Sequence, residues 1–422
     1  MGEGRPVGRL RRDDGALAAV ASRVGAFYEE HPYPPAVDDL EDYGRRWDDQ
    51  RRRAESHLIW PSEPCRDGRS ILVAGCGTTQ AAKLAMRWPR ARIVGIDIGA
   101  ASLSFEEGLK RRYALKNLEL RRLPVERAAE LGQDFDHIVC TGVLHHLAEP
   151  GAGLRALGAV LAEGGALELM VYAPHGRAGV YLIQDYCRRL GIQPTGAEIR
   201  DLIVTLKALP PDHPLVPVLR KSRDLLTREG LADALLNPQD RSYSVPQLLE
   251  LLADAGLKFG RWLRQAPYLP QCGAPAATPH APRLARLPVE EQYAAMELFR
   301  GTMARHTVVA YRKDRRATVA GDFGGDAWPG YVPIRVPDTI AVHDDLPPGA
   351  VAVLINRAHS YTDIYLPIDA VQERLLAAVD GRRTVAEIAQ GTARPDVARA
   401  FFQQLWNYDQ VVFDISRGDR PA

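Results

Sequence analysis

The chain has 422 residues, enough for two or three domains. Apolar residues make up 46% and charged residues 25% of it, a balance typical of globular proteins that excludes a largely disordered chain. The formal net charge of +1 argues against a dedicated nucleic-acid binder, because such proteins carry an excess of basic residues.

Five cysteines are scattered through the chain, and none forms a CxxC pair or a Cys/His spacing that suits zinc. Their odd count, without a recognisable signal peptide, favours a reducing compartment. No apolar run approaches the ~20 residues that a membrane-spanning helix needs. We therefore expect a cytoplasmic protein with no bound metal, no membrane contact and no nucleic-acid partner.

Residues 1–69 predict a helical cap. Apolar residues recur at helical spacing over 15–30, and the prolines of the following HPYPP force an extended strap. Tyr28 in the helix and Tyr33 in the strap are placed to close over a bound ligand. The alternative for this segment is a simple packing arm.

A regular α/β pattern begins at residue 70 and predicts a parallel sheet with helices on both faces. The expected strands are 70–75, 92–97, 117–122, 136–141, 166–172, about 259–269, and 306–312. A turn is expected at Gly164-Gly165, before the fifth strand. The pattern pauses at 176–240, where several helices are expected to form a lid, and resumes where Ser244 can cap a helix.

The most informative motif is a glycine turn followed by an acid. The first strand runs into Gly75-Cys76-Gly77-Thr78-Thr79-Gln80, and Asp97 closes the second strand twenty residues past Gly77. Glycine allows positive φ and close approach of a ligand. An acid at this distance can accept both hydroxyls of a ribose, so the pair predicts a nucleoside-bearing cofactor.

Two more segments follow in order, FDHIVCTGVLHHL at 135–147 and LAEGGALELMVY at 161–172. The four pieces together resemble class I S-adenosylmethionine-dependent methyltransferases, over about 71–172 and more loosely over 244–312. The resemblance implies a Rossmann-like seven-stranded sheet and S-adenosylmethionine as cofactor. The cofactor-binding residues that it implies are Gly75, Cys76, Gly77, Gln80, Asp97, Ile98, Leu123, Thr141 and Gly142.

This chain departs from the family at two points, having Ala74 and Pro124 where acids are usual or frequent. Cofactor contacts there would use backbone groups or other side chains. The resemblance also places the end of the fourth strand near the reactive methyl group.

His146, or else His145, is the leading candidate for a general base, because histidine titrates near neutrality. The alternative for one of the pair is packing under the next helix. Tyr172 can orient an acceptor or serve as a core aromatic. In the segment that follows, Arg177 could hold a carboxylate or phosphate of the substrate, and Tyr181 is expected beside it as a substrate residue at the mouth of the same cleft.

Residues 316–339 are rich in glycine and proline and predict a linker. Residues 340–422 then read as a strand at 350–357, helices within 369–381, 382–391 and 394–410, and a closing strand at 411–416. This order resembles the small winged-helix domains that hold peptides for peptide-modifying enzymes. A domain that only docks on the enzyme or builds a homodimer is the alternative.

The leading functional prediction is methyl transfer to oxygen or nitrogen of a small-molecule or peptide acceptor in a biosynthetic pathway. A second possibility is a peptide or protein methyltransferase whose C-terminal domain recruits the chain. A nicotinamide-dependent oxidoreductase is disfavoured because the third glycine of a dinucleotide site is missing and because a turn is expected at Gly164-Gly165. A nucleic-acid regulator is disfavoured because Arg382, Arg383 and Arg394 form no basic stripe.

Overall fold

A computed structural model of the protein describes residues 14–314 and 321–416, apart from 36, 38, 223–224 and 226. The polar N-terminal residues and the first part of the expected linker lie outside these ranges. Within them, no helix combines the length and apolarity needed to span a membrane.

The centre of the molecule is a seven-stranded sheet with the order β3-β2-β1-β4-β5-β7-β6. Strands β1 to β5 are parallel, and β7 runs antiparallel to both of its neighbours. This is the expected Rossmann-like sheet, with the order reversing beside β1. The strands are β1 Ser70–Ala74, β2 Arg92–Asp97, β3 Leu118–Arg122, β4 Phe135–Thr141, β5 Leu161–Tyr172, β6 Leu257–Trp262 and β7 Arg305–Arg312.

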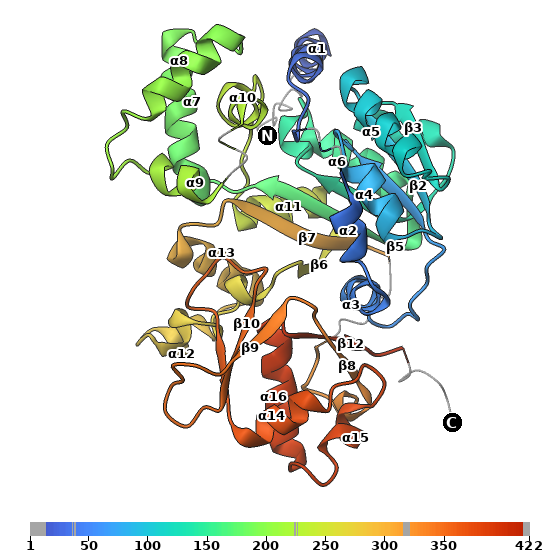
Figure 1. The fold of residues 1–422 in the computed structure, drawn as a ribbon, viewed down its shortest axis with the longest axis vertical. Helices are drawn as coiled ribbons and strands as arrows, with labels where there is room; N and C mark the ends of the chain where they lie inside the picture. The colour runs from blue at the N-terminus through green and yellow to red at the C-terminus, as the bar shows by residue number, and fades with distance from the viewer. Residues whose placement is uncertain are drawn as a thin grey trace, which may run out of the picture.

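Helices cover both faces of this sheet (Figure 1). Because strand side chains alternate between faces, Ile71 and Val73 of β1 pack in one apolar cluster, and Leu72 and Ala74 pack in another. The first cluster lies under α4 (Gln80–Arg87) and α5 (Ala100–Arg112), and the second under α6 (Pro150–Ala159) and α11 (Val245–Asp254). Helix α11 begins with a capping box at Ser244, as expected.

The N-terminal cap consists of α1 (Asp14–Glu30), α2 (Glu41–Arg45) and α3 (Asp49–Ile59). Ile59 and Trp60 at the end of α3 pack on Ala166, Val309 and Tyr311 of the sheet. Helix α3 therefore covers the β5–β7 face only toward one end of these strands. The other end, with the carboxyl terminus of β5, remains open to a cavity.

The predicted turn at Gly164-Gly165 is wrong. Both glycines lie inside β5, where the pairing with β4 shifts between Phe135 and His137. A Cβ at Gly165 would stand 2.8 Å from the Leu161 side chain and 2.9 Å from a backbone oxygen, so only glycine fits this bulge.

The segment between β5 and β6 forms the expected group of helices, drawn in green in Figure 1. They share an apolar core of their own, which Phe27 of α1 joins. A second group, which the sequence did not indicate, separates β6 from β7. The helices are α7 Ala178–Leu190, α8 Gly196–Leu206, α9 Leu215–Lys221 and α10 Arg228–Leu236, then α12 Ala281–Leu284 and α13 Val289–Arg300.

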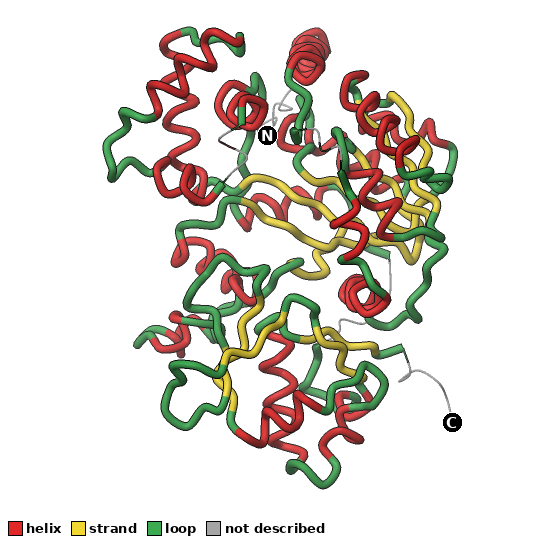
Figure 2. The backbone as a smooth tube through the Cα atoms, viewed as in Figure 1, coloured by secondary structure: helices red, strands yellow, loops and turns green. Residues whose placement is uncertain are grey.

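The C-terminal region contains the predicted helices and strands with three further strands. Its sheets have the orders β11-β10-β9 and β12-β8, both antiparallel, and lie below the large sheet in Figure 2. Its resemblance to a winged helix stays a prediction. The elements are β8 Val332–Arg335, β9 Thr339–Val342, β10 Ala352–Asn356, β11 Leu366–Ile368, α14 Ala370–Ala377, α15 Val385–Ala389, α16 Pro395–Asn407 and β12 Val411–Asp414.

Two expectations about this region need correction. From residue 321 onward the expected linker is part of the fold, because Phe323, Tyr331 and Ile334 are buried in the C-terminal core. The region is also not a separate unit. Ala54 of α3 is buried in the same core, and Arg53 donates a 2.9 Å hydrogen bond to the carbonyl oxygen of Gly381.

Candidate functional site

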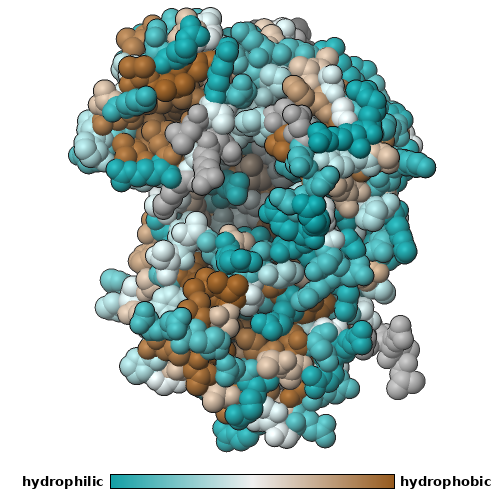
Figure 3. All heavy atoms as spheres, in the orientation of Figure 1, coloured by the Kyte–Doolittle hydropathy of each residue, from teal (hydrophilic) through white to brown (hydrophobic). Residues whose placement is uncertain are grey.

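A cavity of about 1390 Å³ opens at the carboxyl ends of the parallel strands. It is larger than the roughly 300–1,000 Å³ of a pocket for one small ligand, so it has room for a cofactor and an acceptor together. In Figure 3 the molecule is hollowed near its centre, above the C-terminal region. The sequence-predicted residues that line it are Tyr28, Tyr33, Gly75, Cys76, Gly77, Gln80, Asp97, Ile98, Leu123, Thr141, Gly142, His146, Tyr172 and Arg177.

The glycine turn has the backbone conformation that its residues suggest. Gly75 and Gly77 have φ of 72° and 56°, in the left-handed region that favours glycine. A Cβ at Gly77 would lie 2.7 Å from the carbonyl oxygen of Tyr33, because the N-terminal strap rests on the turn. Thr78 holds the strap by donating a 2.7 Å hydrogen bond to the carbonyl oxygen of Pro34.

Asp97 faces this turn from the end of β2. Its two carboxylate oxygens accept hydrogen bonds of 2.8 Å each from the backbone N–H groups of Gly77 and Gly99. Burial raises the pKa of Asp97, and these hydrogen bonds oppose the rise. A carboxylate can accept about four hydrogen bonds, so the fixed side chain can also accept a hydroxyl group from a ligand.

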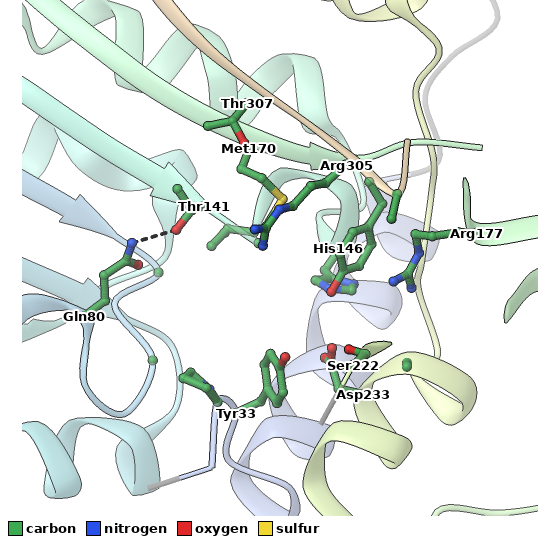
Figure 4. Close-up of a pocket in the computed structure, with 18 of the residues that line it drawn as sticks. Tyr33, Gln80, Thr141, His146, Met170, Arg177, Ser222, Asp233, Arg305 and Thr307 are labelled. Atoms are coloured by element: carbon green, nitrogen blue, oxygen red, sulfur yellow. Dashed lines mark hydrogen bonds between the residues drawn. The ribbon is translucent and has the colours of Figure 1, made fainter. Parts of the chain in front are cut away.

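Thr141 and Gly142 form the neighbouring wall, at the end of β4. The Gln80 side chain donates a 2.6 Å hydrogen bond to the Thr141 hydroxyl, which joins α4 to β4 across the cavity (Figure 4). Glu126 also lines the cavity, two residues beyond Pro124. A carboxylate is thus present near the place where the family frequently has one.

The structure separates the two candidate bases. His146 lines the cavity, and its Nδ1 lies 2.6 Å from the carbonyl oxygen of Gln239. Because a carbonyl can only accept, we assign the proton to Nδ1, which leaves Nε2 as the basic nitrogen. His145 does not line the cavity. It is fully buried, and burial lowers its pKa well below the usual value, so its ring stays neutral.

Tyr172 lies between the histidine pair and the insertion. Its ring centroid is 4.0 Å from that of His145, and the Arg177 guanidinium lies 3.5 Å from it. Burial raises the pKa of Tyr172 well above its usual value, so the hydroxyl keeps its proton. Tyr172 can therefore orient a ligand by hydrogen bonding but cannot serve as a base near neutral pH.

Arg177 and Tyr181, the two residues of the insertion expected to contact the substrate, do not both have free side chains in the cavity. Arg177 reaches the cavity, but it forms an ion pair of 3.1 Å with the buried carboxylate of Asp240, so its charge is already balanced. Tyr181 does not line the cavity and lies beside Arg177, its ring centroid 5.7 Å from the guanidinium carbon. Sequence proximity alone could not show either outcome.

Asp240 also brings a third polar side chain to the histidine pair. The ligand atoms of His145, His146 and Asp240 lie within 4.8 Å of one another. The Arg177 guanidinium on Asp240 places a positive charge beside the group and disfavours a cation there. We therefore assign no metal to it.

The cap and the insertion meet above the cavity. The Tyr28 hydroxyl donates a 2.7 Å hydrogen bond to Asp233 of α10 and accepts one of 3.0 Å from Asn237. Its ring contacts that of His146 edge-on, with centroids 5.9 Å apart. The insertion thus covers the cavity on the side of His146, where a lid was expected.

Several cavity residues escaped the sequence analysis. Tyr172 and Met170 of β5 are paired with Arg305 and Thr307 of β7, and all four line the cavity. Counting back from Tyr172 in steps of two would have indicated the β5 residues, because alternate side chains share a face. The same count reaches Glu168, which also lines the cavity. The other missed residues carry no local signal and include Ser222, Asp233, Arg264, His359, Ser360 and Tyr361.

The raised pKa of Glu168 predicts how the stability of the fold changes with pH. Burial, with Glu55 nearby, raises its pKa to about 7 from an ordinary value of 4.5. The folded protein then retains a proton that the unfolded chain releases, so stability falls as pH rises from about 4.5 to 7. Glu168→Gln removes this loss of stability, so the substitution should stabilise the fold more at pH 8 than at pH 5. The difference between its effects at the two pH values should be at most roughly 3 kcal/mol.

Urea denaturation of both proteins at the two pH values measures this difference. Glu291→Gln, at an exposed carboxylate of α13, controls for the loss of a surface charge. Equal effects of Glu168→Gln at pH 5 and pH 8 would contradict the prediction.

Comparison with known proteins agrees with this geometry. Residues 72–167 match the family model described as a methyltransferase domain. An uncharacterized protein of Synechococcus sp. is 32% identical over 259 residues, which are 57% of this chain and 60% of that protein. A ubiquinone biosynthesis O-methyltransferase of Acinetobacter baumannii is 29% identical over 99 residues, 23% of this chain and 41% of that protein. The chain thus spans less than two thirds of both relatives.

A solved structure resembles nearly the whole chain. The complex of PKMT2 from Rickettsia typhi with AdoHcy matches with a TM-score of 0.60 at 15% identity, covering 90% of this chain and 77% of that one. A second structure of PKMT2 from Rickettsia typhi matches with a TM-score of 0.61 at 14% identity. At this identity the likeness concerns the fold, and it supports a seven-stranded class I architecture with additional C-terminal elements.

Proposed function

Because residues 72–167 belong to a methyltransferase domain family and the sheet has the class I fold, we propose that this protein is an S-adenosylmethionine-dependent methyltransferase. The acceptor atom is an oxygen or nitrogen of a small molecule or peptide. The observation that carries the proposal is Asp97, fixed by two backbone hydrogen bonds against a positive-φ glycine turn at the edge of a large cavity.

The residues of the cofactor half fit this ligand. The turn requires glycine, because a Cβ at Gly75 would collide with Val143 and one at Gly77 with the strap. Asp97 can accept the ribose hydroxyls, and Thr141 with Gly142 would lie beside the methionine part. S-adenosylmethionine would supply an electrophilic methyl group on its sulfonium. Tyr33 and the rest of the strap then cover the turn and limit access of water.

The acceptor half would align the nucleophile and remove its proton. With Nδ1 bound to the Gln239 carbonyl, His146 Nε2 is a basic nitrogen and would accept the proton of an acceptor O–H or N–H group. The protonated Tyr172 hydroxyl would orient the acceptor by hydrogen bonding. Alignment contributes most to such a displacement, so the packing around Tyr172 and the insertion matters as much as the base.

One observation favours a peptide acceptor as the second candidate. His359, Ser360 and Tyr361 of the C-terminal region line the cavity, so an extended acceptor could contact that region while its reactive atom lies near His146. Identification of methylated products in a lysate from the native organism would separate peptide from small-molecule acceptors.

Asp97→Ala tests the proposed cofactor site. Loss of a charged hydrogen-bond acceptor should weaken S-adenosylmethionine binding by about 1.5–3 kcal/mol, or roughly 10- to 150-fold. Titration calorimetry measures this loss, with circular dichroism to check the fold, since Gly77 and Gly99 also lose their partner. The control is Asp185→Asn on α7, where the side chain is 61% exposed. Unchanged affinity, or tight NADH binding without S-adenosylmethionine binding, would refute the proposal.

A further inference from the structure

The acceptor half of the cavity contains an arginine whose charge is not balanced. Arg305, the first residue of β7, extends into the cavity between Thr141 and His146 in Figure 4. Its side chain has no hydrogen bond or ion pair with any residue that the structure describes. Two other cavity arginines differ, because Arg87 pairs with Glu55 and Arg177 pairs with Asp240.

The position of β7 favours the acceptor over the cofactor as the ligand of Arg305. The glycine turn and Asp97 follow β1 and β2, whereas β4 and β5 separate β1 from β7. Neighbouring strands are about 4.8 Å apart, so β7 lies roughly 14 Å from β1. Arg305 is also opposite Tyr172, the residue proposed to orient the acceptor.

A second arginine lies on the adjoining segment. Arg264 follows Leu263, whose N–H donates a 2.9 Å hydrogen bond to the carbonyl oxygen of Thr307 on β7. Arg264 lines the cavity and, like Arg305, forms no ion pair with a described residue. It does lower the pKa of Glu168, so part of its field is balanced by that carboxylate. Arg305 is therefore the principal cation.

Aromatic rings complete this part of the cavity. Tyr172, Tyr268 and Tyr361 all line it, and the last belongs to the C-terminal region. Tyrosine rings provide apolar contact area for a flat organic group, while a guanidinium binds planar oxyanions through paired N–H donors. This combination suits an organic anion better than a neutral or cationic ligand.

We propose that the methyl acceptor is an organic anion whose carboxylate or phosphate group is bound by Arg305 with help from Arg264. That the bound anion is the methyl acceptor rests on the proposed function. The anion site itself can be tested without any methyl transfer. The far wall of the site is formed by the C-terminal region, which would then contribute to acceptor choice through Tyr361.

The test compares three probes of one shape, namely benzoate, phenyl phosphate and benzamide. Their binding to the full-length protein is measured by ligand-observed NMR, with and without S-adenosylhomocysteine. We expect one of the anions to bind at least tenfold more tightly than benzamide, and the better anion identifies the group as carboxylate or phosphate. Arg305→Gln should reduce this preference to within about twofold, and Arg264→Gln should reduce it by a smaller factor.

Arg286→Gln is the matched control, because Arg286 is exposed and lies outside the cavity. Absence of an anion preference in the unmodified protein, or equal effects of Arg305→Gln and Arg286→Gln, would overturn the inference. So would a tenfold loss of S-adenosylmethionine affinity in Arg305→Gln, since the arginine would then bind the cofactor's carboxylate. An anion preference without any S-adenosylmethionine binding would support the site and refute the proposed function.

Discussion

Replacement of His146 by alanine should lower methyl transfer by about 10²–10⁴-fold, the usual contribution of a positioned general base. The reason lies in the ring's orientation, because the Gln239 carbonyl fixes the proton on Nδ1 and leaves Nε2 to accept one from the acceptor. Affinity for S-adenosylmethionine should stay within about twofold, since Asp97 and the glycine turn are untouched. Transfer of a tritiated methyl group to acceptors in a native extract measures the loss.

His146→Gln sharpens this test. A glutamine amide can still donate to the Gln239 carbonyl, but it offers no basic nitrogen, so its turnover should be as low as that of the alanine variant. His145→Ala serves as the comparison, because His145 is fully buried outside the cavity and its loss should act on folding stability. Full turnover in both His146 variants would mean that the enzyme works by alignment alone.

Ending the chain at Pro333 should prevent formation of a stable protein. The truncation removes most of the core in which Ala54 is buried and exposes that side of α3. It also removes Asp409, which forms an ion pair of 3.4 Å with Arg261, a side chain only 10% exposed. Leaving a buried charge unpaired costs about 3–5 kcal/mol, a large share of the roughly 5–15 kcal/mol that stabilises a typical domain.

The soluble yield, circular dichroism and cofactor affinity of the truncated protein measure this effect. Asp409→Ala removes the buried partner of Arg261 and also the acceptor of a 3.0 Å hydrogen bond from the Ala266 N–H group, and it should lower the unfolding free energy by a few kcal/mol. Asp396→Ala, at a side chain 67% exposed, should change it little. A truncated protein that remains folded, binds S-adenosylmethionine and fails only with its native acceptor would instead favour a detachable recruiting domain.

The features that the sequence predicted well are local ones. The strand before Gly75, the turn and Asp97 lie within thirty residues, and each has a residue type that its backbone or chemistry requires. The pattern also indicated the helices of the C-terminal region, because each has its own apolar spacing.

The features that the sequence did not predict depend on contacts between distant segments of the chain. Nothing in the composition around Phe323 shows that it packs against residues ninety positions away, so the glycines there suggested a linker. Likewise, two adjacent histidines look equivalent in a sequence, and only the fold shows which one faces the cavity. Arg305 resembled any surface arginine in the sequence, because its significance comes from its place in the cavity and from the lack of an ion pair with any described residue.

Helix α3 has a consequence for the exchange of parts between related proteins. One side of this short helix carries Ala54 into the C-terminal core, and its end carries Ile59 into the sheet. In a chimera that joins a C-terminal region from another protein at residue 320, the foreign core would therefore have to pack against the α3 of this chain and not against its own. The transferable module is discontinuous, made of residues 49–61 together with 321–416, and a graft that changes acceptor preference must carry both pieces.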